Sequence, residues 1–256
     1  MFCVWGGYCG YRLIRHEQNQ NAQIYALQQQ IALLSEKGKD SSDASLFKEN
    51  QGYHYLAVGN SITLHGLADY WWGEWGMAAS TKESDYVNRI VSALENEMRD
   101  EEIVNAAYNY SVWEVQSHDR AQTWEFLDQY LFPGIDLITV QLSENCSDLT
   151  TFQSDFAALL DHIRQQCGNE TEVVVIDDFW SDEKSNQKRD VCEEMGIVFV
   201  DLSDIRGRKE YQAGYGTPVS GDDGMEHIIE HAGVASHPGD AGMEVIAQRV
   251  LEMIKD

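Results

Sequence analysis

From about Leu46 onward, short apolar runs alternate with segments whose apolar residues recur with a helical period. The apolar runs predict five strands, at Tyr55–Val58, Ile103–Tyr108, Leu137–Leu142, Val173–Asp177 and Ile197–Asp201. The apolar positions of residues 86–98, 152–163 and 243–254 predict amphipathic helices. Strands that are apolar throughout and are separated by helices are typical of a parallel sheet covered on both faces. We therefore expect an α/β domain that binds its ligands beyond the carboxyl ends of the strands.

The first 45 residues follow a different pattern and are assigned to an N-terminal arm, 1–45, that precedes a domain at 46–256. Residues 1–14 are apolar and aromatic, but a membrane-spanning helix takes about 20 residues. No basic stretch precedes them, as it would in a signal peptide. Two interpretations stay open, the remnant of a membrane anchor, which would tether the protein, and a partly apolar terminus. A polar linker, Gly38–Ser45, ends the arm. Before it, an a/d heptad seam predicts a stalk or a weak homo-oligomer, with its apolar positions at Ile24, Leu27, Ile31 and Leu34.

Charge narrows the classes of function. The 256 residues include 18 Lys and Arg against 43 Asp and Glu, a formal net charge of −25. Such a chain repels nucleic acid and anionic membranes, because binding phosphates requires basic side chains. We therefore expect no nucleic-acid partner. The five cysteines are an odd number and too few for a disulfide scaffold, so they leave the redox compartment open.

Three short polar segments lie where a sheet of this kind places its chemistry. Gly59–Thr63 directly follows the first strand, and its Ser61 is a candidate nucleophile. Asn145 follows the third strand, where its amide could donate to a developing oxyanion. His237 lies just before the last helix and is a candidate general base. Each segment alone is also an ordinary turn or surface loop.

Together, the three segments resemble the SGNH, or GDSL-like, hydrolase family over roughly residues 53–254. Gly59–Thr63 is similar to its first block, with Asn60 in place of the usual Asp. Ser143–Cys146 is similar to its third block, with Ser143 for the usual Gly and Cys146 for Asp. His237-Pro238, followed by Gly242 and the last helix, is similar to its final block. The resemblance implies a three-layer α/β/α sandwich with a five-stranded parallel sheet of the flavodoxin-like type. It also implies a serine esterase without metal or cofactor, in which Ser61, His237 and Asn145 are catalytic.

Two departures from the family pattern leave parts of this site open. The acid that usually precedes the histidine by three residues is replaced by Val234. Either another carboxylate supports His237, with the loop upstream of it slightly favoured, or Ser61 and His237 form a dyad supported by a backbone carbonyl. The second block lacks its usual Gly, so another backbone N–H must complete the oxyanion hole. The acid candidates are Asp177, Asp178, Asp222, Asp223 and Glu226, and the candidate N–H donors are Gly76, Tyr110 and Ser111.

An aromatic insertion, Asp69–Met77, follows the nucleophile segment. Aromatic faces beside carboxylates suit the binding of sugars, so we expect some of these side chains to contact the substrate; the alternative is that the rings cap the core. The candidate substrate-binding residues are Trp71, Trp72, Trp75, Trp113 and Glu114.

These features predict a hydrolase of carboxylic esters that acts on a small-molecule or polysaccharide ester, with an acetylated carbohydrate favoured. An acyltransferase with the same Ser–His machinery and a catalytically inactive carbohydrate-binding protein are the alternatives. A secreted or membrane-anchored extracellular location is favoured over a cytoplasmic one. His227, Glu230 and His231 resemble a metal cluster if they lie on a helix, but no third ligand is evident and we predict no metal. Cys167 and Cys192 lie in helical patterns and are expected to be buried thiols.

Overall fold

The computed structural model describes residues 43–116 and 119–254, and the predicted heptad segment lies outside them. Five parallel strands form a sheet in the order β2-β1-β3-β4-β5. Their bounds are β1 Tyr53–Gly59, β2 Ile103–Asn109, β3 Leu137–Gln141, β4 Glu172–Ile176 and β5 Val198–Val200. Each expected strand is present within two residues of its predicted ends, and the predicted three-layer α/β/α sandwich is confirmed.

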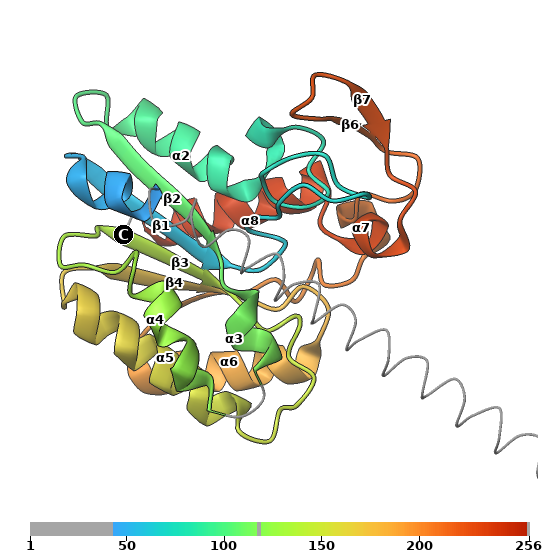
Figure 1. Cartoon of the computed structure of the whole chain (residues 1–256). Coiled ribbons are helices and arrows are strands. Elements are labelled where there is room, and N and C mark those ends of the chain that lie inside the picture. Colours follow the sequence, from blue (N-terminus) through green and yellow to red (C-terminus); the bar gives the residue numbers. More distant parts are fainter. Residues whose placement is uncertain (1–42, 117–118, 255–256) are drawn as a thin grey trace, which may run out of the picture. The chain divides into compact units, whose positions relative to one another are not determined.

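Helices cover both faces of the sheet (Figure 1). One face carries α2 (Tyr86–Glu97) and α8 (Asp240–Met253). The other face carries α5 (Phe152–Cys167) and α6 (Asp182–Met195), together with the short α3 (Ser111–Val115) and α4 (Trp124–Leu127). Single-turn 3-10 helices lie at Lys82–Ser84, Arg120–Thr123 and Lys209–Tyr211.

Side-chain alternation along β1 divides the core between the two faces. Leu56 and Val58 belong to the cluster on the α5 and α6 side, and Tyr55 and Ala57 belong to the cluster on the α2 and α8 side. All four are fully buried, because a central parallel strand is covered on both faces.

The compact unit begins at Asp43, so the predicted boundary after residue 45 needs correction. Residues 43–49 are helical, and Ala44 and Phe47 are buried in the core. The Phe47 ring packs edge-on against His54 and Phe132. The end of the segment predicted as a linker is therefore part of the fold, because two apolar side chains in a polar stretch bury themselves against the sheet.

Beyond the carboxyl ends of the strands lies a lobe that the sequence did not predict (Figure 1). It contains an antiparallel hairpin of β6 (Pro218–Ser220) and β7 (Glu226–Ile228), and the short helix α7 (Ala232–Ser236). The aromatic insertion joins this lobe, since Asp222 N donates to Trp72 O and Glu74 N donates to Asp222 Oδ2, both at 2.9 Å.

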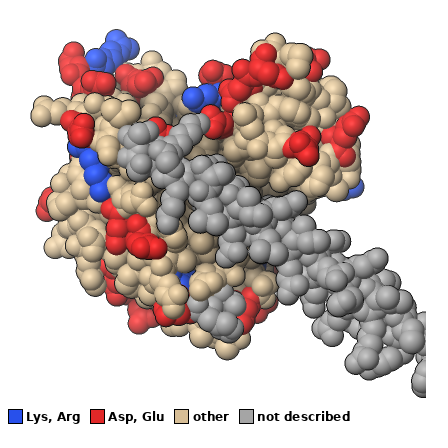
Figure 2. All heavy atoms as spheres, in the orientation of Figure 1, with Lys and Arg blue, Asp and Glu red and all other residues tan. Residues whose placement is uncertain are grey.

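Acidic side chains lie over much of the described surface in Figure 2, and basic side chains lie at a few places. Within the described residues, no helix is both long and apolar enough to cross a bilayer.

Candidate active site

Ser61 lies in the tight turn that follows β1, and Gly59 and Asn60 shape that turn. A Cβ at Gly59 would lie 1.8 Å from Thr63 Oγ1 and 2.8 Å from Gln141 O, so only glycine fits. The Asn60 side chain accepts a hydrogen bond from Ile62 N at 3.0 Å, which closes the turn as an Asx motif. Ser61 thus stands at the carboxyl edge of the sheet, as its position in the sequence predicted.

His237 meets Ser61 from the opposite end of the chain. Its Nε2 lies 2.9 Å from Ser61 Oγ, and its Nδ1 donates to the backbone carbonyl of Gly233 at 2.7 Å. A proton on Nδ1 leaves Nε2 as the acceptor for the serine hydroxyl. The two residues therefore have the geometry of a nucleophile and its general base.

None of the five predicted acids supports His237, so the favoured expectation of a carboxylate partner is wrong. The carbonyl of Gly233 occupies the position that an acid would take, which is the dyad alternative. Each candidate acid lies elsewhere: Asp177 pairs with Arg206, Asp178 accepts from Ser143 Oγ at 2.7 Å, Asp222 accepts from Glu74 N at 2.9 Å, Asp223 lies 2.9 Å from His227 Nε2, and Glu226 is exposed on β7.

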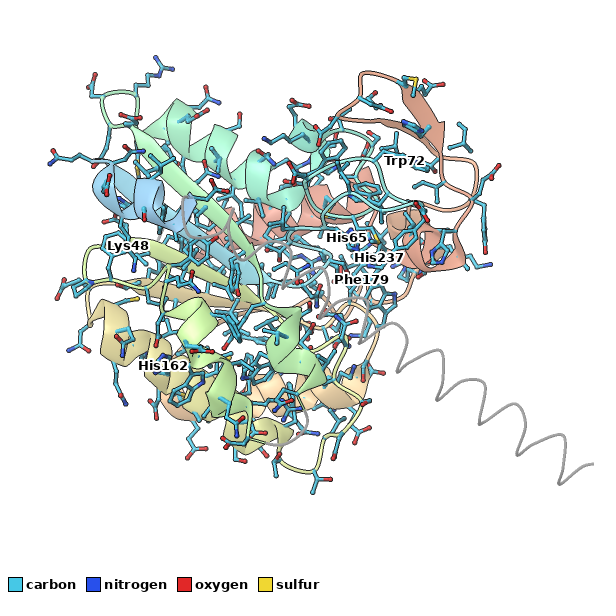
Figure 3. The ribbon with its side chains drawn as sticks, in the orientation of Figure 1. Lys48, His65, Trp72, His162, Phe179 and His237 are labelled. Atoms are coloured by element: carbon cyan, nitrogen blue, oxygen red, sulfur yellow. The ribbon has the colours of Figure 1, made fainter. Side chains whose placement is uncertain are left out.

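Burial lowers the pKa of His237 from 6.5 to about 4. The hydrogen bond to Gly233 opposes this shift by stabilising the protonated ring, and nearby His65 and His231 reinforce it by repelling a second positive charge. Figure 3 shows His237 beside His65 and Phe179, in the part of the molecule that carries Ser61. At neutral pH the imidazole is therefore unprotonated and ready to accept a proton.

The three backbone N–H groups predicted for the oxyanion hole are already engaged. Gly76 N donates to Asp85 Oδ2 at 3.0 Å, Tyr110 N donates to Gly59 O at 2.6 Å, and Ser111 N donates to Asn109 Oδ1 at 3.1 Å. Each N–H already has a partner, in a cap, between the ends of β1 and β2, or in a turn, so these candidates are not supported.

Two other donors fit the hole better. Among the described residues, no hydrogen bond occupies the N–H of Ser61. One N–H of the Asn145 side chain donates to Glu114 Oε2 at 2.6 Å, which leaves its second Nδ2 hydrogen available. Ser61 belongs to the first sequence block and Asn145 to the third.

Glu114 does not line a substrate site as predicted, because it is buried and fully committed to hydrogen bonds. Its carboxylate accepts from Asn60 Nδ2 at 3.0 Å, Ser143 N at 2.6 Å, and both the N and Nδ2 of Asn145 at 3.3 and 2.6 Å. Burial raises the pKa of Glu114 above its ordinary value, and the four donors oppose that shift.

Glu144 is a second carboxyl group next to Ser61, and it is half-buried. It accepts from Asn60 Nδ2 at 2.7 Å and from Phe179 N at 3.2 Å. Burial raises the pKa of Glu144 to about 8, as do the neighbouring Asp178 and Glu114, while Lys188 lowers it. Lys188 is itself fully buried and donates to the carbonyls of Leu142 and Ile176 at 2.7 and 2.5 Å. The sequence carries no spacing signal for this network, since its members come from five separate segments.

Three of the four predicted substrate-binding tryptophans belong to the core. Trp71, Trp75 and Trp113 are at most 2% exposed, as in the alternative in which the rings cap the core. Trp72 is half-buried and stacks on His227, with ring centroids 4.5 Å apart. Trp180 was not among the predicted substrate-binding residues. It is 36% exposed and packs edge-on against His237, with ring centroids 5.1 Å apart. Its Nε1 donates to Ser236 O at 3.2 Å, so its ring is fixed beside His237.

The helix assumed for His227 and His231 is absent, because His227 lies in β7 and His231 caps α7. His231 stacks on Tyr70 instead, and within the described residues no three acidic, histidine or cysteine side chains are grouped to hold a metal. Cys146, Cys167 and Cys192 are buried free thiols, as expected for the last two. Burial raises the pKa of Cys167 and of Cys192 to about 11.

The solved structures that this chain is similar to include GDSL-type lipases. One is described as a GDSL-like lipase from Parabacteroides merdae, with a TM-score of 0.49, 14% identity, and coverage of 79% of this chain and 95% of that chain. Another is the lipase Lip_vut3 from a goat rumen metagenome, with a TM-score of 0.46, 14% identity, and coverage of 78% and 96%. A third belongs to the lipolytic G-D-S-L family and comes from Veillonella parvula, with a TM-score of 0.45, 15% identity, and coverage of 79% and 98%. No protein-family model and no curated protein matches the sequence.

Proposed function

We propose that this protein hydrolyses carboxylic esters through a Ser61–His237 dyad. The observation that carries the proposal is the 2.9 Å contact between Ser61 Oγ and a His237 ring whose other nitrogen is fixed by Gly233 O. Ser61 Oγ attacks the acyl carbonyl as Nε2 accepts the hydroxyl proton. The Ser61 N–H and the Asn145 side chain stabilise the resulting oxyanion.

The proton then passes from His237 Nε2 to the leaving alcohol as the ester C–O bond breaks, which leaves the acyl group on Ser61. In the second half of the reaction, water loses a proton to Nε2 as its oxygen attacks the acyl carbonyl. Nε2 then returns that proton to Ser61 Oγ as the bond between Ser61 and the acyl group breaks, which releases the carboxylic acid and restores the free serine. The Gly233 carbonyl keeps the imidazole in the same orientation through both steps, because it accepts the Nδ1 proton in each protonation state.

The test is turnover of p-nitrophenyl acetate by the wild type and by Ser61→Ala. We expect the substitution to lower kcat by several orders of magnitude, because covalent catalysis is lost. A fluorophosphonate probe should label the wild type once, at Ser61. Ser154→Ala is the matched control, since Ser154 lies exposed on α5 and donates only to Thr151 O. Labelling at another residue, or undiminished turnover in Ser61→Ala, would refute the assignment.

For the alcohol part of the ester we propose an acylated carbohydrate. This part is supported by Trp180, whose partly exposed ring stands beside His237 and can stack on the C–H face of a sugar. Trp180→Ala should raise KM for an acetylated sugar several-fold and leave KM for p-nitrophenyl acetate nearly unchanged. Equal effects on both substrates would remove the support for a carbohydrate. In the same assays, a rise in acyl transfer to an added sugar alcohol would identify the transferase alternative.

A further inference from the structure

Next to Ser61, Asn60 connects the buried carboxyl group of Glu114 with that of the half-buried Glu144. Its side-chain nitrogen donates one hydrogen to Glu114 at 3.0 Å and the other to Glu144 at 2.7 Å, while its oxygen accepts from Ile62 N at 3.0 Å. Every polar atom of the Asn60 amide is therefore used, and its orientation is fixed by three partners.

Glu114 is the centre of this network and also holds the turn that carries Asn145. Ser143, at the start of that turn, has a φ of 139°, a conformation that residues other than glycine rarely adopt. The strained turn is secured by Ser143 N on Glu114 at 2.6 Å and by Ser143 Oγ on Asp178 at 2.7 Å. The backbone N–H of Asn145 and one hydrogen of its Nδ2 then reach the same Glu114 carboxylate.

We propose that Glu114 is a positioning residue for the oxyanion hole: it holds the Asn145 side chain so that the second Nδ2 hydrogen faces the developing oxyanion. The inference rests on the proposed function, since it requires Asn145 to donate to the oxyanion. Glu114 acts through Asn145 and does not touch the substrate.

The same geometry explains why an asparagine precedes Ser61. An aspartate at position 60 would place an oxygen, in place of the amide nitrogen, within about 3 Å of two other carboxyl oxygens. Three carboxyl groups would then converge with no amide N–H between them. Asn60 supplies the two hydrogens that let Glu114 and Glu144 lie side by side.

The sharpest test is Glu114→Gln. All four groups that face Glu114 are N–H donors, so an amide must oppose one of them with its own N–H. Three of the donors share Oε1 and only the Asn145 side chain faces Oε2, so the new N–H falls opposite Asn145 Nδ2. We expect kcat to fall by roughly 10- to 100-fold with KM changed less than about three-fold, somewhat less than the loss of a whole oxyanion donor.

A double-mutant cycle separates positioning from general damage. If Glu114 acts through Asn145, Glu114→Gln should lower kcat little further in an Asn145→Ala background. The exchange variant Glu114→Gln with Asn145→Asp should recover the melting temperature, since Gln can donate to Asp, without recovering kcat. The matched control is Asp136→Asn, because Asp136 also accepts a backbone N–H, that of His54 at 2.7 Å, but at the opposite end of β1. Its kcat should stay within about two-fold of the wild type.

The outcomes distinguish this inference from the proposed function. If Asn145→Ala leaves kcat unchanged, the oxyanion role of Asn145 fails and the inference fails with it. If Asn145→Ala lowers kcat but Glu114→Gln does not, or if their effects multiply, the esterase assignment stands and the positioning role is overturned. Should Glu114→Gln not fold, Glu114→Asp, which keeps the charge but withdraws it by one methylene, enters the same cycle. If neither variant folds, Glu114 serves the fold and the inference is wrong.

Discussion

Lowering the pH provides the most direct test of the catalytic base. The structure lowers the pKa of His237 from 6.5 to about 4, chiefly by burial, with His65 and His231 adding to the shift. The difference corresponds to about 3 kcal/mol in favour of the neutral ring. An ordinary imidazole would be only about 3% unprotonated at pH 5, whereas a base with a pKa of about 4 would be about 90% unprotonated. The fraction of competent enzyme at pH 5 therefore differs about thirty-fold between the two cases.

The assay is kcat/KM for p-nitrophenyl acetate between pH 3.5 and 8, because kcat/KM reports the ionisation of the free enzyme. Product is best counted after quenching to one pH, since the colour of nitrophenol itself depends on pH. We expect activity to stay near its plateau at pH 5 and to reach half its plateau near pH 4. His231→Gln should move this midpoint upward, toward 6.5, because it removes a positive charge that disfavours protonation of His237.

Stability must be followed in parallel. The folded pKa of His237 lies below its unfolded value, so the unfolded chain binds the extra proton and the fold loses stability as the pH falls from 6.5 to 4. Glu144 acts oppositely: its folded pKa of about 8 exceeds 4.5, so the fold gains stability as the pH falls through that range. Enzyme held at each pH and returned to pH 7 should recover full activity. A reversible midpoint near pH 6.5 in the wild type would refute the proposed environment of His237.

Two further predictions concern the network and the boundary of the fold. Asn60→Asp should lower the free energy of unfolding by roughly 2–4 kcal/mol in a denaturant titration, as expected for an unpaired buried carboxylate. Adding Glu144→Gln to the same chain should restore part of this loss. If it restores none, the contact between positions 60 and 144 at 2.7 Å is contradicted. Removing residues 1–42 should leave kcat and the melting temperature unchanged. Removing residues 1–49 should lower the free energy of unfolding by at least about 3 kcal/mol, because Phe47 is then missing from the core. Equal stability of the two truncated proteins would show that residues 43–49 do not support the fold.

The fold was predictable from the sequence wherever burial is uniform along an element. The central strands are apolar throughout because helices cover both faces, so their positions could be predicted within two residues. Helix α6 gave a weak signal, since Val191 and Cys192 are its only buried apolar residues and its buried Lys188 looks like a surface residue in the sequence. The hairpin of β6 and β7 was missed because each strand has three residues, too few to show alternation.

The site was predictable where function depends on side chains at sheet edges, and unpredictable where it depends on the backbone or on burial. Ser61 and His237 lie in short recognisable segments, and the structure brings them together. The role of the Gly233 carbonyl could not be predicted, because any residue has a carbonyl group. Trp71 and Trp75 looked like binding residues because an aromatic-rich loop has the same sequence whether its rings face a sugar or the core.

The missing aspartate at position 234 follows from the shape of α7. Val234 is buried against the core, so an acid there would be desolvated. The last carbonyl groups of a helix have no partners within the helix, and here Gly233 O accepts from both His237 Nδ1 and Ser236 Oγ, at 2.7 and 2.8 Å. A carbonyl fixes the tautomer as a carboxylate would, but it carries no full charge to stabilise the imidazolium. The helix end therefore replaces the orienting function of the acid and not its electrostatic one. Burial lowers the pKa of His237, and the dipole of the Gly233 carbonyl opposes that shift only in part, whereas a carboxylate would add a full negative charge.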